Sequence, residues 1–128
     1  MKYLSLDEVI AIHDDMIEEY GGSHGIRDLG LIQSAISRPQ ASFGGQDLYP
    51  SIFHKAAALF HSVMFNHAFV DGNKRTTISV TARFLTLNGF SLEVSQKMFV
   101  EFPLKVENEH LDLETIGAWL KKHSKKIK

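Results

Sequence analysis

The chain has 128 residues, 44% of them hydrophobic, which is enough for one sizeable core and too short for two, so we expect a single domain spanning residues 1–128. Its net charge of −1 argues against nucleic-acid binding by bulk charge, and the lack of cysteine excludes disulfides and thiolate metal sites. The first ten residues carry acids where a signal peptide needs an apolar core, and no apolar run approaches membrane-spanning length. We therefore expect a cytoplasmic protein whose direct partners include neither a membrane nor a nucleic acid.

The first predicted helix begins after Ser5 and ends at Gly21. Ser5, followed three residues later by Glu8, has the pattern of a capping box, and apolar residues then recur at helical spacing as far as residue 20. His13 falls within this apolar stripe. A histidine in such a stripe is more often a hydrogen-bonded core residue than a metal ligand, so we assign it a structural role.

A second, shorter helix is predicted from Asp28 to just before Pro39. Asp28 can cap this helix, and the residue before a proline rarely continues one. Residues 40–50 lack helical periodicity and contain two glycines and a proline, so we expect a loop with a short extended edge. Loops of this length are often functional, although a plain surface excursion would have the same composition.

The third and fourth predicted helices are the most apolar part of the chain. The third begins at Ser51 and is apolar on nearly every side as far as residue 65, which is typical of a helix in the centre of a domain. The fourth runs from about Asn73 to a stop at Asn88 and Gly89. The turn at residues 67–72 therefore joins two buried helices, which would hold it from both sides.

The pattern after residue 90 is weaker. Residues 96–107 have helical character, but Pro103 falls inside them and should end or kink the helix near Phe102. Asp112 is expected to cap a last helix, and the lysine-rich residues 121–128 are expected to form a solvated tail. The sequence thus predicts an all-α fold, a compact bundle of about six helices around a central buried pair.

Residues that could take part in catalysis or ligand binding are concentrated at positions 67–75, HAFVDGNKR. His67 can act as a general base, and Asp71 can bind Mg²⁺, which takes one or two carboxylates together with phosphate oxygens. Phe69 is expected to insert into the core and fix the direction of its neighbours. If the fourth helix begins at Asn73, its free N–H groups and positive dipole end favour a phosphate.

Each of these residues also has an ordinary explanation. Asp71 could be a helix cap, and Gly72 could simply allow a turn. Lys74 and Arg75 lie at the amino end of the helix, where the dipole disfavours cations unless an anion is present. A departure of this kind from local structural preferences often marks a functional site. Together the residues supply a base, a metal ligand and oxyanion stabilisation, which phosphoryl transfer requires.

The stretch HAFVDGNKR closely resembles the signature HxFx(D/E)GNxR of the Fic/Doc family, in particular its Doc (death-on-curing) toxin branch. Residues 25–39 and 43–50 are similar to Doc-type sequence in order and spacing. The resemblance implies an all-helical fold that binds ATP with Mg²⁺. It makes His67 the catalytic base. The other roles that it implies are a metal contact at Asp71, a core anchor at Phe69, and phosphate binding at Gly72, Asn73, Lys74 and Arg75.

The resemblance also implies a docking segment for the target protein. In Fic-like proteins the segment between the second and third helices is a flap that docks the target chain by strand addition. In this sequence the flap falls on residues 41–49, centred on Phe43, Gly44 and Gly45.

Two positions favour the kinase branch of the family. Fic proteins that transfer AMP have a second glycine and a further arginine where this chain has Lys74 and Ile78. The resemblance to Doc implies a nucleotide bound the other way round, with the γ-phosphate at the motif, and phosphorylation of a threonine of elongation factor Tu that arrests translation. The inhibitory pattern (S/T)xxxE(G/N) has no match in the sequence, so a separate antitoxin of the Phd type is expected to control the toxin.

Three alternatives remain open at the level of sequence. AMP transfer to a protein hydroxyl is the first, and a non-catalytic helical binding module is the second. The third is a metal phosphohydrolase of the HD type, supported only by the pair His13-Asp14 and by His54 and His61, which are seven residues apart on one helix. Charged residues flanking the second helix are assigned structural roles in preference to a place in the site; they are Arg27, Asp28 and Arg38.

Overall fold

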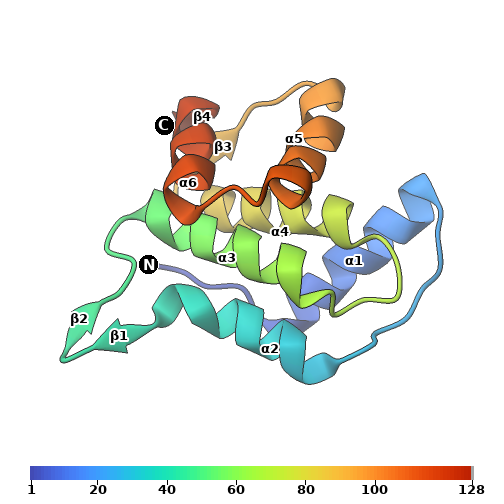
Figure 1. Cartoon of the computed structure of the whole chain (residues 1–128), viewed down its shortest axis with the longest axis horizontal. Helices are drawn as coiled ribbons and strands as arrows, with labels where there is room; N and C mark the ends of the chain where they lie inside the picture. Colours follow the sequence, from blue (N-terminus) through green and yellow to red (C-terminus); the bar gives the residue numbers. More distant parts are fainter. Residues whose placement is uncertain (128) are drawn as a thin grey trace.

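The computed structural model describes residues 1–127, which form six α-helices and two small antiparallel strand pairs (Figure 1). The elements in chain order are α1 (Leu6–Tyr20), α2 (Leu29–Ser37), a 3₁₀ turn η1 (Arg38–Gln40), β1 (Ser42–Phe43), β2 (Gln46–Asp47), α3 (Ile52–Asn66), α4 (Asn73–Leu87), β3 (Phe90–Leu92), α5 (Gln96–Glu109), α6 (Leu113–Lys122) and β4 (Ser124–Lys126). Within residues 1–127, no helix combines the length and apolar character needed to cross a bilayer. The predicted helical bundle is confirmed.

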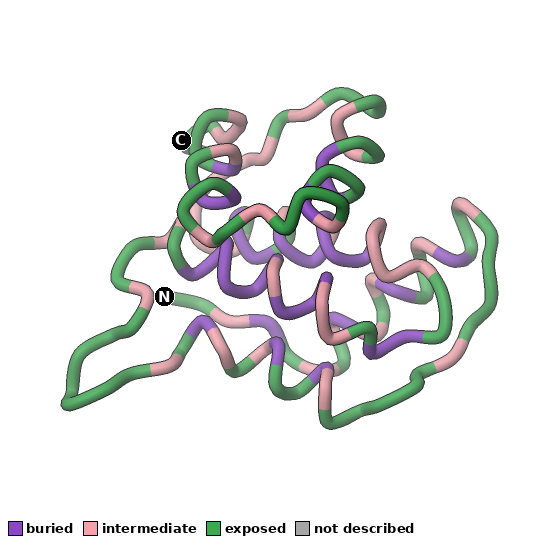
Figure 2. Tube along the Cα trace, in the orientation of Figure 1, coloured by how far each residue is buried: buried purple, intermediate pink, exposed green. Residues whose placement is uncertain are grey.

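Helices α3 and α4 form the centre of the molecule, with the other helices arranged around them (Figure 1). The buried parts of the trace are concentrated on these two helices (Figure 2). Residues 55–60 of α3 are all buried, and in α4 Ile78, Val80 and Phe84 are among the most deeply buried side chains. Because α3 and α4 are held by the core along their length, the loop between them has two fixed ends.

The helix starts follow from side-chain caps that the sequence predicts. Ser5, Asp28, Ser51 and Asp112 each accept a hydrogen bond from the backbone N–H three residues on, and Ser5 and Glu8 complete the expected capping box. These contacts satisfy N–H groups that have no partner within the helix, so each fixes where its helix begins.

Pro103 does not end its helix near Phe102, because α5 continues through Pro103 as far as Glu109. A proline inside a helix removes one backbone hydrogen bond. Packing compensates for this loss: Phe102 is buried and stacks on Trp119 of α6, with ring centroids 3.7 Å apart, and Val106 is fully buried one turn later. The local sequence pattern could not predict this packing, because Trp119 belongs to another helix, α6.

The prediction of a solvated tail at residues 121–128 is also wrong for the part that the structure describes. Residues 124–126 form β4, which pairs antiparallel with β3, and Ile127 N–H donates to the Gly89 carbonyl at 2.8 Å. The lysine side chains at 125 and 126 remain exposed while the backbone is paired. The lysine-rich composition therefore predicts that the side chains of this segment are exposed, but it does not predict whether the backbone pairs in a strand. Lys128 lies outside the described residues.

The extended edge expected within residues 40–50 forms a β-hairpin that projects from the body of the molecule (Figure 1). Gly44 and Gly45 both have positive φ, as a two-residue hairpin turn requires. Lys55 of α3, only 2% exposed, holds the base of the hairpin because its Nζ donates to Pro39 O and pairs with Asp47 Oδ2, both at 3.2 Å.

Candidate active site at the α3–α4 loop

The α3–α4 loop turns sharply at its first residue. His67 follows the last residue of α3 and adopts the left-handed conformation, with φ 48° and ψ 48°. This conformation is uncommon for a residue with a side chain. It leaves the His67 ring exposed at the mouth of the loop.

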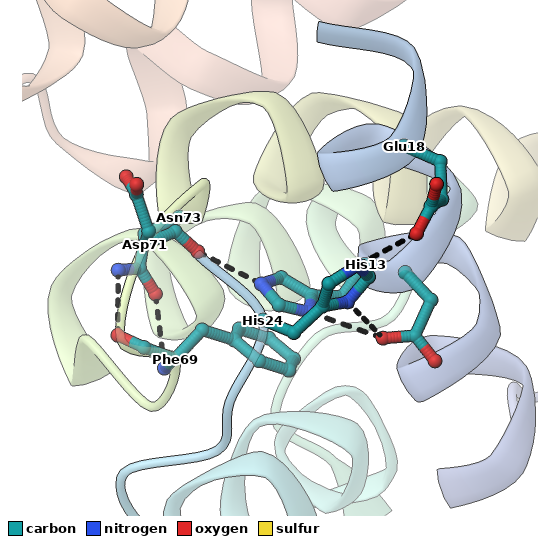
Figure 3. A network of polar contacts seen from close by, with 7 residues as sticks. His13, Glu18, His24, Phe69, Asp71 and Asn73 are labelled. Carbon is teal, nitrogen blue, oxygen red and sulfur yellow. Dashed lines mark hydrogen bonds and ion pairs between the residues drawn. The ribbon is translucent and has the colours of Figure 1, made fainter. Parts of the chain in front are cut away.

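Asn73 fixes the path of the loop. Its side-chain amide forms two hydrogen bonds with one residue: Oδ1 accepts from Phe69 N–H at 3.2 Å, and Nδ2 donates to Phe69 O at 3.0 Å (Figure 3). The Asn73 side chain is therefore engaged with the loop, which leaves its backbone N–H as the group available to a ligand.

His13 of α1 supports the loop from inside the protein. Its ring lies flat on the Phe69 ring, with centroids 3.9 Å apart and an interplanar angle of 8°, and both residues are buried. His13 Nε2 donates to the backbone oxygen of Asp71 at 2.8 Å (Figure 3). The structural role assigned to His13 is therefore observed, and its hydrogen bond is with the candidate site.

The segment between α1 and α2 lies alongside the α3–α4 loop as a second extended chain. Ile26 and Phe69 form an isolated antiparallel bridge, Val70 N–H donates to Gly25 O at 3.1 Å, and Arg27 N–H donates to Ala68 O at 2.7 Å. The close approach requires glycine, because a Cβ on Gly25 would lie 3.0 Å from a methyl carbon of Val70. We call residues 21–28 the companion segment. One signal of this segment is present in the sequence, namely the three glycines at positions 21, 22 and 25.

His24 ties the companion segment back to α1. Its Nδ1 lies 3.2 Å from Asp14 Oδ1 and its Nε2 lies 2.7 Å from Glu18 Oε1 (Figure 3). Hydrogen bonds to Glu18 and then to Asp14 raise the pKa of His24 above its usual value, because both ring nitrogens face carboxylates.

Asp71 is held as a carboxylate by two backbone N–H groups. Oδ2 accepts from Ser23 at 3.1 Å and Oδ1 accepts from Gly72 at 2.9 Å, and these two bonds, the Ser23 bond first, lower the pKa of Asp71. The side chain is exposed and each oxygen has a further lone pair, so Asp71 can serve as a single carboxylate ligand to Mg²⁺. Among residues 1–127, no cluster of three or more His, Asp or Glu side chains could hold a metal by itself.

The start of α4 opens into a polar hollow of about 250 Å³. Its lining comprises His67, Val70, Asp71, Gly72, Asn73, Lys74 and Arg75. Gly72 precedes the helix, and in the described chain no side chain caps it, so the N–H groups of residues 73–75 are available to an anion. The structure therefore brings together in one hollow every predicted motif residue except Phe69, which lies buried behind it.

The two cations of the motif each have a partner outside the loop. Lys74 Nζ lies 3.2 Å from Glu107 Oε1 of α5, and the Arg75 guanidinium lies 4.5 Å from the centre of the Tyr20 ring of α1. Tyr20 in turn stacks on Phe99 of α5. The sequence offered no signal for these contacts, because Glu107, Tyr20 and Phe99 come from other helices.

The predicted flap is not brought to this site. Phe43, Gly44 and Gly45 form the hairpin tip beyond the start of α3, whereas the hollow lies at its end, and the 15 residues of α3 span about 22 Å. In the part of the chain that is described, none of the three lines the hollow. The extended chain beside the loop is the companion segment, so the assignment of target docking to the hairpin lacks support from the geometry.

The other charged and histidine residues considered in the sequence analysis have structural partners. Asp28 caps α2, Arg27 Nη2 donates to Asn66 O, and Arg38 donates to Tyr49, His61 and Ser62. His54 hydrogen-bonds with Ser51. Each histidine invoked for the metal phosphohydrolase alternative thus has its own separate partner, and the structure does not assemble them into a site.

Comparison with known proteins agrees with the fold and the loop. A model described as Fic/DOC family matches residues 3–85, and the chain therefore belongs to the Fic/DOC family. It is 41% identical over 103 residues to Toxin Doc of Mycolicibacterium smegmatis, an alignment that covers 79% of each chain. It is 35% identical over 89 residues to Protein kinase doc of Escherichia phage P1, with 70% of each chain covered. These relatives support the Doc toxin branch that the motif predicts.

Proposed function

We propose that this protein is the toxin of a toxin–antitoxin module and transfers the γ-phosphate of ATP to a hydroxyl group of a target protein. The observation that carries the proposal is the hollow at the start of α4, where His67, the Asp71 carboxylate and three free backbone N–H groups face the same space. A base beside an anion site with a carboxylate for Mg²⁺ is what phosphoryl transfer requires. The names of the two relatives, a toxin and a protein kinase, point the same way.

The proposed mechanism assigns one step to each group. The γ-phosphate lies against the N–H groups of residues 73–75 with Arg75 beside it, and a ring nitrogen of His67 accepts the proton of the target hydroxyl. The hydroxyl oxygen then bonds to the γ-phosphorus as the bond to the β-phosphate oxygen breaks and ADP leaves. Asp71 would hold Mg²⁺, which neutralises charge on the phosphate oxygens when bound.

Two side chains support γ-phosphate transfer over AMP transfer. Lys74 occupies the position of the second glycine of AMP-transferring relatives, and Ile78 occupies that of their additional arginine. Ile78 is fully buried in the core and offers no charge to the hollow. The hollow therefore lacks the second arginine, which in AMP-transferring relatives would hold further phosphates of the nucleotide.

The target and the partner are proposed from the Doc resemblance. Elongation factor Tu is the proposed acceptor, and a Phd-type antitoxin is the proposed inhibitor. The companion segment lies next to His67 and already pairs with the loop along one side, so the target chain is better placed to pair there than at the hairpin.

The deciding experiment follows the label from ATP to elongation factor Tu. Purified protein is incubated with the factor, Mg²⁺ and ATP labelled at either the γ- or the α-phosphate. We expect transfer of the γ label only, and a rate at least about 100-fold lower in His67→Ala, because the general base is lost.

A matched control for this experiment is His110→Ala. His110 is also an exposed histidine in the left-handed conformation after the last residue of a helix, but it follows α5 and lies outside the hollow. It should transfer the label at the wild-type rate. Transfer of the α label would establish AMP transfer instead. Loss of transfer in both variants would contradict a specific catalytic role of His67. If His67→Ala still arrests growth although it transfers no label, a non-catalytic binding module would be favoured.

A further inference from the structure

A second hollow adjoins the phosphate hollow on the side of α5. Its volume is about 260 Å³, and it is lined by Lys74, Arg75, Phe99, Val100 and Leu104. We call it the α5 groove. Val100 and Leu104 are each 43% exposed, so two aliphatic side chains of α5 face solvent beside a strongly polar site. Single exposed apolar residues are common on protein surfaces. Apolar side chains that line a hollow next to a few polar groups are typical of ligand-binding sites.

The α5 groove and the phosphate hollow are neighbours, because Lys74 and Arg75 line both of them. These two residues form the first turn of α4, where the free N–H groups lie. Contacts with α1 and α5 hold this boundary: Glu107 pairs with Lys74, and Tyr20 lies under Arg75 and stacks on Phe99. A ligand with an anionic end in the hollow therefore has an apolar surface next to it, on the other side of Lys74 and Arg75.

We propose that the α5 groove receives the nucleoside, that is, the base and ribose of the nucleoside triphosphate whose γ-phosphate lies in the hollow. This inference rests on the proposed function and specifies where the rest of the substrate lies. Phe99, Val100 and Leu104 supply the apolar surface that a base can cover, and the cations at the boundary lie where the α- and β-phosphates cross.

The test compares a complete nucleotide with its phosphate part alone. Binding of a non-hydrolysable ATP analogue and of inorganic triphosphate, each with Mg²⁺, is measured by calorimetry for the wild type, Leu104→Ser and Val100→Ser. Each substitution should weaken binding of the ATP analogue by about three- to tenfold, because apolar contact with the base is lost. Binding of inorganic triphosphate should stay at the wild-type level, because both substitutions leave the cations and N–H groups in place.

Ile127→Ser is the matched control. Ile127 is 45% exposed, close to the value for Leu104, and lies outside the groove near the end of the chain. It should bind both ligands as the wild type does. Thermal unfolding of each variant verifies that the fold is intact, and having two groove positions keeps the test valid if one substitution unfolds the protein.

Each remaining outcome has a separate meaning. If both groove variants bind the ATP analogue as tightly as the wild type, the nucleoside lies elsewhere, and the proposed function stands if γ-label transfer is observed. Equal weakening of both ligands would also overturn the groove assignment, because it would indicate damage to the phosphate hollow. If the groove variants lose only affinity for a purified antitoxin, the groove is a protein interface. Failure of the wild type to bind either ligand would overturn the groove proposal and the proposed function together.

Discussion

At the scale of single residues, the candidate site depends on side chains that hold the loop as well as on those that face the hollow. Asn73 is the clearest case, because its amide pairs with both backbone groups of Phe69 and thereby closes the loop over four residues. His13 then supports Phe69 from the core. The side chains of Asn73 and His13 thus hold the loop that carries His67, while the proposed contact of Asn73 with a phosphate is made by its backbone N–H.

Asn73→Ala should show that the loop requires this pair. The substitution leaves the Phe69 backbone groups without their partners in a partly buried position, so the free energy of unfolding should fall by about 1–2 kcal/mol. Label transfer should fall at least tenfold in the folded protein because the loop loses its geometry. Urea unfolding and the transfer assay measure the two effects. Asn108→Ala, an exposed position on α5, is the control and should change neither quantity; equal behaviour of the two variants would contradict the role given to Asn73.

At the scale of elements, the start of α4 has to approach α1 very closely. Gly72 has φ +74°, and a Cβ at this position would lie 2.9 Å from Ile17 Cδ1, a buried atom of α1. Both the backbone conformation and the space therefore require glycine here. The close approach also places the Asp71 carbonyl within reach of His13, so it couples the helix start to the loop support.

Gly72→Ala and Gly44→Ala separate the two reasons for glycine. Gly44 has φ +58° but nothing within 4 Å of an added Cβ, so its substitution should destabilise the protein by about 1 kcal/mol through backbone strain alone. Gly72→Ala carries the same strain together with the clash against Ile17, and we expect a loss of about 2–3 kcal/mol. Chemical denaturation measures both values. Equal losses would mean that α1 moves aside without cost.

At the scale of the whole molecule, two ionisable groups near the site act on stability in opposite pH ranges. The pKa of Asp71 is lowered from 3.8, chiefly by the Ser23 N–H, so its contribution is present above pH 3.8 and is lost as the pH falls through the lowered value. The pKa of His24 is raised from 6.5 by Glu18 and Asp14, so its contribution is complete below pH 6.5 and is lost as the pH rises through the raised value. The Asp71 contact joins the companion segment to the α3–α4 loop, and the His24 contacts join it to α1.

Unfolding measured from about pH 2 to pH 9 should reveal both contributions. The difference between wild type and Asp71→Asn should shrink below pH 3.8, and the difference between wild type and His24→Gln should shrink as the pH rises above 6.5. Differences that stay constant across these ranges would show that neither group changes its protonation on folding. His54→Gln, an exposed histidine on α3, is a control for general effects of histidine removal.

Local sequence determined most of the helices and the composition of the site. Capping residues mark the starts of α1, α2, α3 and α6, and short-range periodicity shows which helices are central, because both signals act within a few residues. The motif at residues 67–75 likewise contains its base, carboxylate and anion site within nine neighbouring positions, so one turn between two buried helices was enough to bring them together.

Tertiary structure alone decided everything that depends on residues distant in the chain. It carried α5 through Pro103, paired residues 124–126 with β3, and placed the companion segment beside the loop in the position that sequence had given to the hairpin. It also set Glu107 and Tyr20 against the two cations of the motif and opened the α5 groove next to them. The physical reason is the same in each case: these contacts gain their free energy from packing and pairing between segments that local propensity and spacing cannot relate to one another.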